Sequence, residues 1–598
     1  MPPRAFTAAF ASSAALALLL PSALGCSTFL VGKDASSDGS LFVTHSDDGE
    51  GNPDARLSYV PPADHAPGSM RPVWPDLEDN PRYVGDLRGD TYLPGVSVPP
   101  DTPPTEPIGH IPQVPHTFGY SEGNYGIMNE HQLSIGESTC SGRFVASAIG
   151  AGGEALFCVN ELSRVAMERC STARCAIRVM GDLAVERGFY GAAGSFEGGS
   201  ETLLIADTEE GWVMHFVPYP ETNSAVWVAR RVPDDEVAVV MNMFVIREVN
   251  STDEDNFAHS DNMIPVARKH GLWDPDADGP FDFTRAYSAG EYAHKYYSGR
   301  RVWGAFRLVD ENNPLPAQYG DLRVDAPYPF SVKPSKPVTA RSLFAWHRDW
   351  YAGTPFDMAR GLAAGPWGSP DRFNGGDAEA SIPGAFERSI ALHRTTYTHV
   401  LQTRRDRPDG SGGIMWYAPH AAHGSCFVPV LAGLRKLPRG LVVGNASVVD
   451  RDSQWWAHRF AHNVAQLKYS AAAEVVRDAQ ARWEDAGAAL IARVDAAVAK
   501  AKKEGVELDV DEAFGEAFDA HAEAVRRAWW HLADDIVLRF ADGFVTDPES
   551  KAPPGEAAGY PAWWLEKVGW REGPPPPPPP PENGWGRGIV GGAASATE

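Results

Sequence analysis

The chain has 598 residues, of which 43% are hydrophobic and 22% charged, so it can bury a large core and is not disordered as a whole. Its formal net charge at pH 7 is −25. A surface this acidic repels nucleic acids and anionic membranes, which argues against both as partners, but it leaves room for a local basic pocket that binds a carboxylate.

The first 25 residues have the pattern of a secretory signal peptide. A short start with Arg4 is followed by an apolar stretch over residues 8–20, and small residues stand at Ala23 and Gly25. The pattern predicts cleavage before Cys26 and a mature protein that is secreted or lies in the lumen of the secretory pathway. No later segment has the roughly 18 uncharged apolar residues that a membrane-spanning helix needs.

The next part of the chain reads as strands, then helices, then strands. Two β-rich runs flank turn residues at Asp34–Gly39 and predict a hairpin at the expected new N-terminus. Residues 50–120 carry many prolines, which indicates a long excursion and no helix bundle. Apolar residues in Glu161–Arg187 recur at spacings of three and four, which predicts one or two amphipathic helices. This order favours an α+β or layered-sandwich fold. The expected strands are 28–31, 41–44, 133–136, 202–206, 211–217, 226–228 and 237–243.

Long helices are expected toward the C-terminus. The sequence between about 455 and 541 is rich in Ala, Arg and Glu, and the clearest helical stretches are Ala471–Lys503 and Asp511–Phe540. Apolar residues recur through them, so we expect them to pack on the core. The run Pro574–Pro581 predicts an extended tail that serves as a spacer more readily than as an SH3-type ligand.

Cys26 gains a chemical advantage if cleavage makes it the first residue. Its own α-amino group then lies beside its thiol and titrates near pH 7.7–8.0, so it can accept the thiol proton near neutral pH. Nucleophile and base share one residue, which is the solution of N-terminal-nucleophile enzymes. Two other roles stay open: a disulfide partner, and a lipid-modified cysteine, although Ala23 stands where a lipoprotein usually has a larger aliphatic residue.

Several blocks of the sequence resemble the C69 family of dipeptidases. These are cysteine hydrolases of the N-terminal nucleophile superfamily, related to penicillin V acylase and bile salt hydrolase. The resemblance covers roughly residues 26–545, and ordered blocks in register are more specific than any single motif. The blocks are Cys26–Ala35, Asp38–Ser40, Ser46–Asp48, Gly123–His131, Leu203–Asp207, Asp255–Phe257 and Gly353–Met358.

The resemblance implies a fold and an activity. The fold is a four-layer αββα sandwich of the N-terminal nucleophile hydrolase type with a helical C-terminal elaboration. The activity is that of a cysteine-type dipeptidase, which hydrolyses a small peptide substrate through a thioester on the N-terminal cysteine and needs no cofactor or metal. The chain then divides into a signal peptide (1–25), a catalytic domain (26–455), a helical C-terminal subdomain (456–545) and a Pro/Gly-rich tail (546–598).

The resemblance also implies catalytic residues by position. Asp48, with Asp47 beside it, matches an aspartate that approaches the cysteine and its amino group, where a carboxylate stabilises the ammonium form. Without the resemblance, these aspartates would be read as a solvated acidic turn. Asn129 is the best match, and Asn242 the second, to asparagines that hold the oxyanion of the tetrahedral intermediate.

One position departs from the family pattern. The family usually has arginine three residues before the aspartate, but this chain has His45, which is shorter and only partly charged at neutral pH. Arg301 matches a second arginine of the related acylases. His45, Asp47 and Arg301 are the predicted substrate-binding residues.

Two other functions stay open. The same machinery serves amide acylases that act on N-acyl compounds. His45 also keeps open a non-catalytic binding protein, secreted or lipid-anchored. Sequons at Asn250 and Asn445 predict a glycoprotein where the secretory route of the host glycosylates. The sequence does not indicate an oligomeric state.

The remaining motifs favour structural roles. Asp274, Asp276 and Asp278 resemble the start of a calcium loop, but Arg285 stands at the twelfth position in place of the required glutamate, which favours an acidic turn.

The cysteines and histidines outside the blocks predict no metal or redox site. His420, His423 and Cys426 have ligand-like spacing without an evident fourth ligand, so no zinc site is predicted. Cys170 and Cys175 do not share a helical face, which favours packing roles over a redox pair.

Overall fold

The computed structural model describes residues 25–573 except 50–51, 78, 97, 192–198, 291–294, 317–327, 374–381, 383–385 and 550–554. All of the predicted signal peptide except Gly25 lies outside the described residues, as does Pro574–Pro581.

A seven-stranded antiparallel sheet contains the start of the predicted mature chain. The predicted hairpin is confirmed: Leu30 lies opposite Val43 and Val31 opposite Phe42. Every residue of both hairpin strands is buried, because the sheet is covered on both faces. Across this sheet the order is β16 (Ser331–Val332), β14 (Val237–Val240), β1 (Thr28–Val31), β2 (Leu41–Asp47), β17 (Tyr397–Thr403), β18 (Ile414–Pro419) and β19 (Val428–Leu431).

A second antiparallel sheet has eight strands. Its central strands are rich in β-branched and aromatic residues, which suit a buried pleated surface. The order is β15 (Phe257–His259), β13 (Ser224–Arg231), β12 (Gly211–Tyr219), β11 (Ser200–Ala206), β10 (Ser134–Cys140), β9 (Gly126–Asn129), β8 (Tyr120–Glu122) and β3 (Ser58–Val60).

The two sheets pack against each other through one apolar core. Leu30 and Val43 of the first sheet share this core with Leu204 and Val213 of the second. The approach is closest at Gly136 of β10, where a Cβ atom would lie 2.7 Å from the backbone oxygen of Thr44 in β2. A side chain at this position would therefore push the sheets apart, and its absence brings the next residue of β10 against β2.

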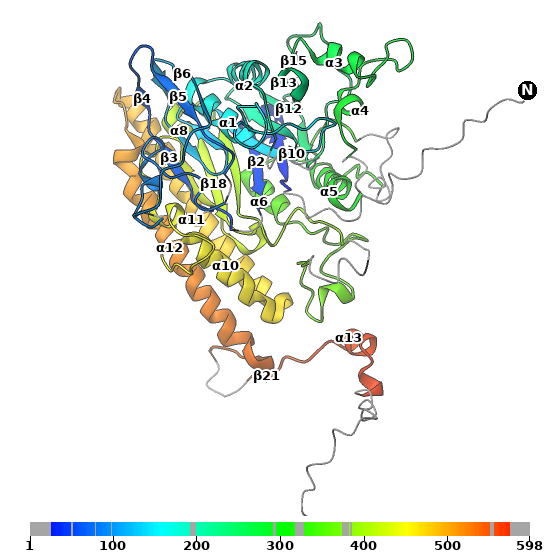
Figure 1. The fold of residues 1–598 in the computed structure, drawn as a ribbon. Helices are drawn as coiled ribbons and strands as arrows, with labels where there is room; N and C mark the ends of the chain where they lie inside the picture. Colours follow the sequence, from blue (N-terminus) through cyan, green and yellow to red (C-terminus); the bar gives the residue numbers. More distant parts are fainter. Residues whose placement is uncertain are drawn as a thin grey trace, which may run out of the picture.

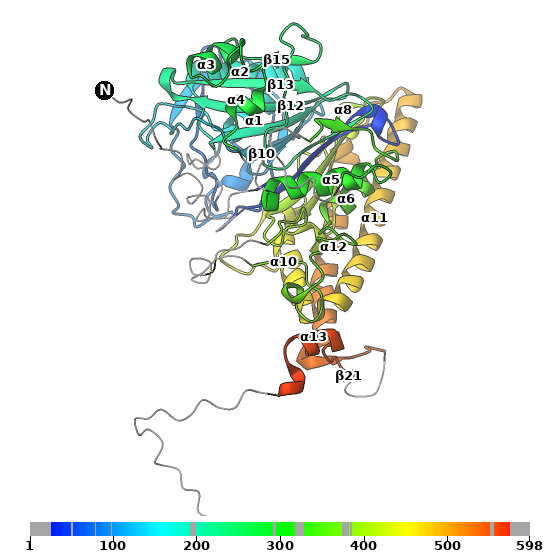
Figure 2. The same ribbon diagram turned by 90° about the vertical axis from the view of Figure 1, so that its right-hand side faces the viewer.

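Helices cover the outer side of each sheet, so the fold is α+β (Figures 1 and 2). The helices α1 and α2 pack on the second sheet, and α5, α6 and α10–α12 contact strands of the first. In the part of the chain that the structure describes, no helix combines the length and apolarity needed to cross a bilayer. The helices are α1 (Val159–Arg169), α2 (Ala173–Arg187), α3 (Met263–Lys269), α4 (Phe283–Tyr287), α5 (Arg300–Val309), α6 (Ala340–His347), α8 (Asp409–Gly412), α9 (Arg439–Val442), α10 (Gln454–Val464), α11 (Tyr469–Glu504), α12 (Val510–Phe540) and α13 (Ala562–Lys567).

The predicted amphipathic segment forms α1 and α2, but the role expected for its two cysteines was wrong. Cys170 is the residue at which α1 ends, and Thr172 caps the start of α2 by accepting a hydrogen bond from the backbone of Cys175. This break turns the chain so that Cys170 and Cys175 form a disulfide, with their Cα atoms 5.5 Å apart. The prediction failed because it treated the segment as one continuous helical surface.

The proline-rich excursion contains short strands and, among its described residues, no α-helix, as predicted. Buried ion pairs attach it to α1 and also join separate parts of the excursion to each other. Arg71 donates to Glu168 at 2.7 Å and to Glu161 at 2.8 Å, both on α1. Arg82 pairs with Asp54 at 3.1 Å. The strands confined to the excursion are β4 (Ala63–Asp64), β5 (Met70–Val73), β6 (Gly109–Pro112) and β7 (His116–Thr117).

The two long C-terminal helices, α11 and α12, agree with the predicted helical stretches and pack against β19. Glu484 of α11 is buried and connects them to the rest of the molecule. Its carboxylate accepts from the backbone of Phe427 at 3.1 Å and from Arg341 at 3.0 Å, and it also pairs with Arg348.

We expect Glu484→Ala to lower the free energy of unfolding by about 2–3 kcal/mol, because it leaves the amide of Phe427 and the two arginines without their acceptor. The loss is not larger because both arginines keep some contact with solvent. Asp485→Ala is the matched control. Asp485 is 78% exposed in its pair with Arg341, so its loss should cost less than about 1 kcal/mol. Urea unfolding of both variants measures the difference, and equal destabilisation would contradict this role of Glu484.

Candidate active site

Cys26 lies two residues before β1 and is only 3% exposed. Its neighbour Ser27 is bound to β2, since the backbone amide of Ser27 donates to Ser46 Oγ and the amide of Ser46 donates to the Ser27 carbonyl, both at 3.0 Å. Arg301 Nη1 donates to the carbonyl of Cys26 at 2.8 Å. The predicted nucleophile is therefore held rigidly inside the fold.

His45 and Glu137 meet Cys26 at the contact between the sheets. The Cys26 sulfur, a ring nitrogen of His45 and a carboxylate oxygen of Glu137 all lie within 4.8 Å of one another. His45 Nδ1 lies 2.7 Å from the carbonyl oxygen of Glu137, and since a carbonyl only accepts, Nδ1 carries the hydrogen. His45 Nε2 is then a lone-pair nitrogen, with no hydrogen-bond partner among the described residues. These three donors are also close enough to hold a thiophilic metal ion.

Burial sets the protonation states of this cluster. The pKa of the Cys26 thiol is raised well above its ordinary value by burial and then by the negative charges of Glu137, Asp47 and Asp48. The pKa of His45 is lowered by burial, although Glu137 opposes this effect. With Gly25 still attached, the site therefore holds a protonated thiol beside a neutral imidazole.

Asp48 is buried and belongs to the wall around Gly25 and Cys26. Arg388 Nη2 donates to Asp48 Oδ2 at 2.5 Å and also to the carbonyl of Gly25. Thr395 donates to the other carboxylate oxygen. The guanidinium of Arg388 thus connects Asp48 to the peptide bond that the predicted cleavage would break. Asp48 is therefore not a solvated turn residue.

Asp47, the residue before Asp48, is the last residue of β2 and is also buried. Its carboxylate accepts from Asn124 Nδ2 at 2.6 Å. Burial, followed by the charges of Glu137 and Asp48, raises the pKa of Asp47 to about 8. This carboxyl is neutral at pH 7, and it adds a negative charge to the site only at higher pH.

Asn242, predicted to hold the oxyanion, and Arg301, predicted to bind the substrate, lie together beside Cys26. Arg301 Nη2 donates to Asn242 Oδ1 at 2.6 Å, so one guanidinium joins Asn242 to the Cys26 carbonyl. Asn242 Nδ2 donates to Thr139 O at 2.7 Å, which leaves its second amide hydrogen for another acceptor. The backbone of Asn242 is left-handed (φ 57°) just beyond β14, which turns its side chain out of the sheet.

The structure places Asn129 in a different role. Its Nδ2 donates to the carbonyls of Met167 and Cys170 at 3.0 and 2.7 Å, and its Oδ1 accepts from the amides of His131 and Leu133. Both amide hydrogens are used, so none is left for an oxyanion. Asn129 instead joins the β9–β10 turn to the end of α1, and this corrects its sequence-based assignment.

Sequence reasoning missed Glu137 and Arg388. The only signal for Glu137 was a charged residue inside a strand directly after a glycine, which fits a close approach between backbones. Arg388 carried no signal, because it lies 340 positions from Asp48 and no block of the family resemblance includes it. The acidic turn predicted at Asp274–Asp278 is confirmed by hydrogen bonds within the turn.

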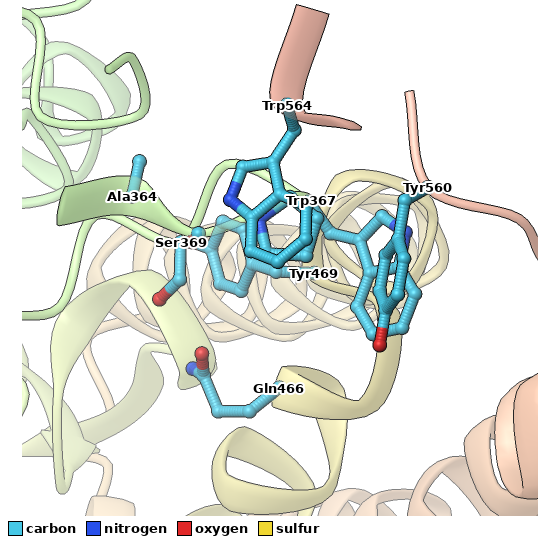
Figure 3. A pocket seen from close by; sticks show the side chains of 9 residues that line it. Ala364, Trp367, Ser369, Gln466, Tyr469, Tyr560 and Trp564 are labelled. Carbon is cyan, nitrogen blue, oxygen red and sulfur yellow. The ribbon is translucent and has the colours of Figure 1, made fainter. Parts of the chain in front are cut away.

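The pocket in Figure 3 lies away from this cluster, between the loop before Asp371 and the C-terminal segment. Its lining is aromatic and contains none of the residues described above as contacting Cys26. The lining residues are Ala364, Gly365, Pro366, Trp367, Ser369, Gln466, Tyr469, Tyr560 and Trp564.

Known proteins resemble the chain along most of its length. The family model described as Peptidase family C69 matches residues 25–482. A "Probable dipeptidase" of Salmonella dublin is 24% identical over 70% of this chain and 83% of its own length. A "Probable dipeptidase" of Latilactobacillus sakei is 22% identical over 79% of this chain and 88% of its own. A "Dipeptidase" of Bifidobacterium longum is 24% identical over 83% and 87%.

We expect Asp47→Asn to change how stability depends on pH. The unfolded chain loses this proton near pH 3.8, whereas the native protein keeps it until about pH 8. The native state therefore holds one more proton in this window, and this carboxyl makes the free energy of unfolding fall as pH rises. The asparagine variant lacks this slope, so its stability relative to the parent should rise from pH 4 to pH 8 and then level off.

Urea unfolding at each pH unit from 5 to 9 measures the effect of Asp47→Asn. Asp64→Asn serves as the control, because Asp64 is 92% exposed. A stability difference between Asp47→Asn and its parent that stays constant across this range would contradict the raised pKa.

Proposed function

Because the chain belongs to peptidase family C69, we propose that it is a secreted cysteine dipeptidase whose mature form begins at Cys26. One observation carries the proposal: Cys26 is buried among the carboxylates of Glu137, Asp47 and Asp48, directly after a Gly25 carbonyl that Arg388 binds. The family match begins at residue 25, and relatives named as dipeptidases support the reaction.

The fold proposed with this function is the four-layer αββα sandwich of the N-terminal nucleophile hydrolases. The face-to-face packing of the two sheets supports it, as do α1 and α2 on one outer side and α5, α6 and α10–α12 on the other. The division into a catalytic domain (26–455) and a helical subdomain (456–545) remains a prediction.

Cleavage before Cys26 is proposed as the activating step. While Gly25 is attached, the nitrogen of Cys26 is an amide and cannot accept a proton. Cleavage converts it into an amine that titrates near pH 7.7–8.0. Asp48, which shares Arg388 with the Gly25 carbonyl, is close enough to orient the resulting ammonium group. A positive charge beside the thiol lowers the thiol pKa and opposes the effect of the surrounding carboxylates.

The proposed reaction then runs in two halves. The amine takes the thiol proton, and the sulfur attacks the carbonyl of the dipeptide. The free amide hydrogen of Asn242 stabilises the oxyanion, an interaction worth about 3–4 kcal/mol in comparable sites. The Cys26 ammonium gives its proton to the leaving amine, and a thioester remains. Water then attacks the thioester with the amine as base, which releases the acid and restores the thiol.

The charges of the site favour a dipeptide over an N-acyl compound. A dipeptide has an ammonium group at one end and a carboxylate at the other. Asp48 and Glu137 offer negative charge for the ammonium group, which an N-acyl compound lacks. Arg388 offers the complement: its Nε and Nη1 are buried and have no hydrogen-bond partner in the described part of the chain. Nε and Nη1 point to different sides of the guanidinium, so either one of them can donate to the free carboxylate of the substrate, which the positive charge of Arg388 also attracts.

The nucleophile is tested by Cys26→Ala with N-terminal sequencing of the mature protein. We expect mature chains that begin at Cys26 in the parent and a loss of dipeptidase activity of at least 10³-fold in the variant. The assay includes N-acyl amino acids beside dipeptides. A mature chain that begins elsewhere, or activity that survives without the thiol, would contradict the mechanism. Faster hydrolysis of the N-acyl substrates would favour the acylase, and no hydrolysis by the parent would favour a binding protein.

The carboxylate site is tested by Arg388→Gln with pairs of substrates. The parent should hydrolyse a free dipeptide with a kcat/KM about 10–100-fold higher than that of the same dipeptide with an amidated C-terminus. In the variant the two substrates should be hydrolysed equally, because the donors that read the carboxylate are gone. General damage to the fold would lower both rates and keep their ratio, and an unchanged ratio would refute this role of Arg388.

A further inference from the structure

A second buried cluster lies outside the Cys26 site and joins three separate parts of the chain. Asp371 lies two residues after Ser369 of the pocket lining, His423 lies in the turn between β18 and β19, and His462 is in the last turn of α10. His423 Nε2 lies 3.1 Å from Asp371 Oδ1, and His462 Nε2 lies 3.0 Å from Asp371 Oδ2. All three side chains are buried.

We propose that Asp371, His423 and His462 form a binding site for a divalent transition metal, most simply Zn²⁺. Two imidazole nitrogens and one carboxylate oxygen are a zinc ligand set, with a fourth position for water or another side chain. Their donor atoms lie within 4.8 Å of one another. Ligands at about 2.0–2.1 Å from a tetrahedral zinc ion lie about 3.4 Å apart, so only small shifts are needed to admit the ion.

Two further histidines, His393 and His420, lie near the cluster. The ring of His420 lies 5.4 Å from that of His462, and His393 is close enough to sense the charge of Asp371. The Nδ1 atoms of His393, His420 and His423 are buried and, within the described residues, have no hydrogen-bond partner. Unpaired buried polar atoms are costly. Around Asp371, among the described residues, the donor atoms that lie within 4.8 Å of one another belong to Asp371, His423 and His462 alone, so we assign the fourth position to water.

Two further residues contact Asp371. Gln466 Nε2 donates to Asp371 Oδ2 at 2.9 Å, and the amide of Asp371 donates to Ser369 Oγ at 3.3 Å. Such contacts orient the ligands of a metal site. Gln466 and Ser369 both line the aromatic pocket in Figure 3, so the pocket borders two residues that contact Asp371.

The expected role of the metal is structural. It would link α10 and the β18–β19 turn to the loop that carries Asp371. His393 is followed by Arg394 and Thr395, both of which bind Asp48 of the proposed active site. The site is independent of the proposed peptidase chemistry, since none of its three ligands contacts Cys26. No zinc site was predicted from the spacing of His420, His423 and Cys426. Cys426 is not in the cluster, and Asp371 and His462 are distant from His423 in the chain.

Zinc binding is measured on the full mature chain that carries Cys26→Ser, which removes the thiol of the other candidate ligand set. The chain is treated with EDTA, dialysed against Zn²⁺ at about 10 μM free concentration, and analysed by mass spectrometry of the metal. We expect one zinc per chain. His423→Gln and His462→Gln, each made in the same background, should bind zinc at least tenfold more weakly.

The control variant carries His116→Gln and Asp64→Asn, which replace an exposed histidine–aspartate pair. It should still bind one zinc per chain. Co²⁺ provides a second readout, because the parent should show visible absorption bands of tetrahedral cobalt that the two histidine variants lack. Zinc should also raise the Tm of the Cys26→Ser chain and leave that of the variants unchanged. A folded parent that binds no zinc, or equal binding by parent and variants, would overturn the proposal.

Discussion

The close approach of β2 and β10 at Gly136 is the constraint on which the active site depends. Without a side chain at this position, Glu137 comes into contact with His45 and Cys26. The first residue of a chain is normally exposed and mobile, and Cys26 is the predicted first residue of the mature chain. Here it is buried among carboxylates that keep its thiol protonated. A site of this kind needs a nearby positive charge before it can act, and the α-amino group of a newly formed N-terminus can supply it.

Two arginines that are distant from Cys26 in the sequence connect the other residues of this site. Arg301, on α5, joins the Cys26 carbonyl to Asn242, and Arg388 joins Asp48 to the Gly25 carbonyl. Each guanidinium bridges two parts of the site at once, because its donors are arranged in a fixed planar fork. The neutral His45 thus stands in a site that already holds two arginines, and the arginine usual in the family at this position is not the only source of positive charge.

Local sequence patterns predicted helices and strands of this fold well, but they did not predict contacts between residues that are distant in the sequence. The hairpin after Cys26 and the helices α11 and α12 were predicted, because turn residues and apolar periodicity are local signals. The Cys170–Cys175 disulfide was missed because one helix break decided it. Glu137 and Arg388 could not be assigned, since their positions depend on the packing of sheets and loops. Asn129 matched a family block, but its surroundings use both amide hydrogens for structure.

The pH dependence of alkylation of Cys26 tests the central claim most directly. The rate with iodoacetamide is compared between the mature chain and a chain that keeps Gly25 and a short leader. Both chains carry Cys140→Ala, Cys158→Ala and Cys426→Ala, which remove the other free buried thiols of the described residues. If the new amine activates the thiol, the mature chain reacts rapidly with a midpoint at or below about pH 8, and the chain with the leader reacts slowly up to pH 9. Equal rates and equal midpoints in the two chains would contradict the account.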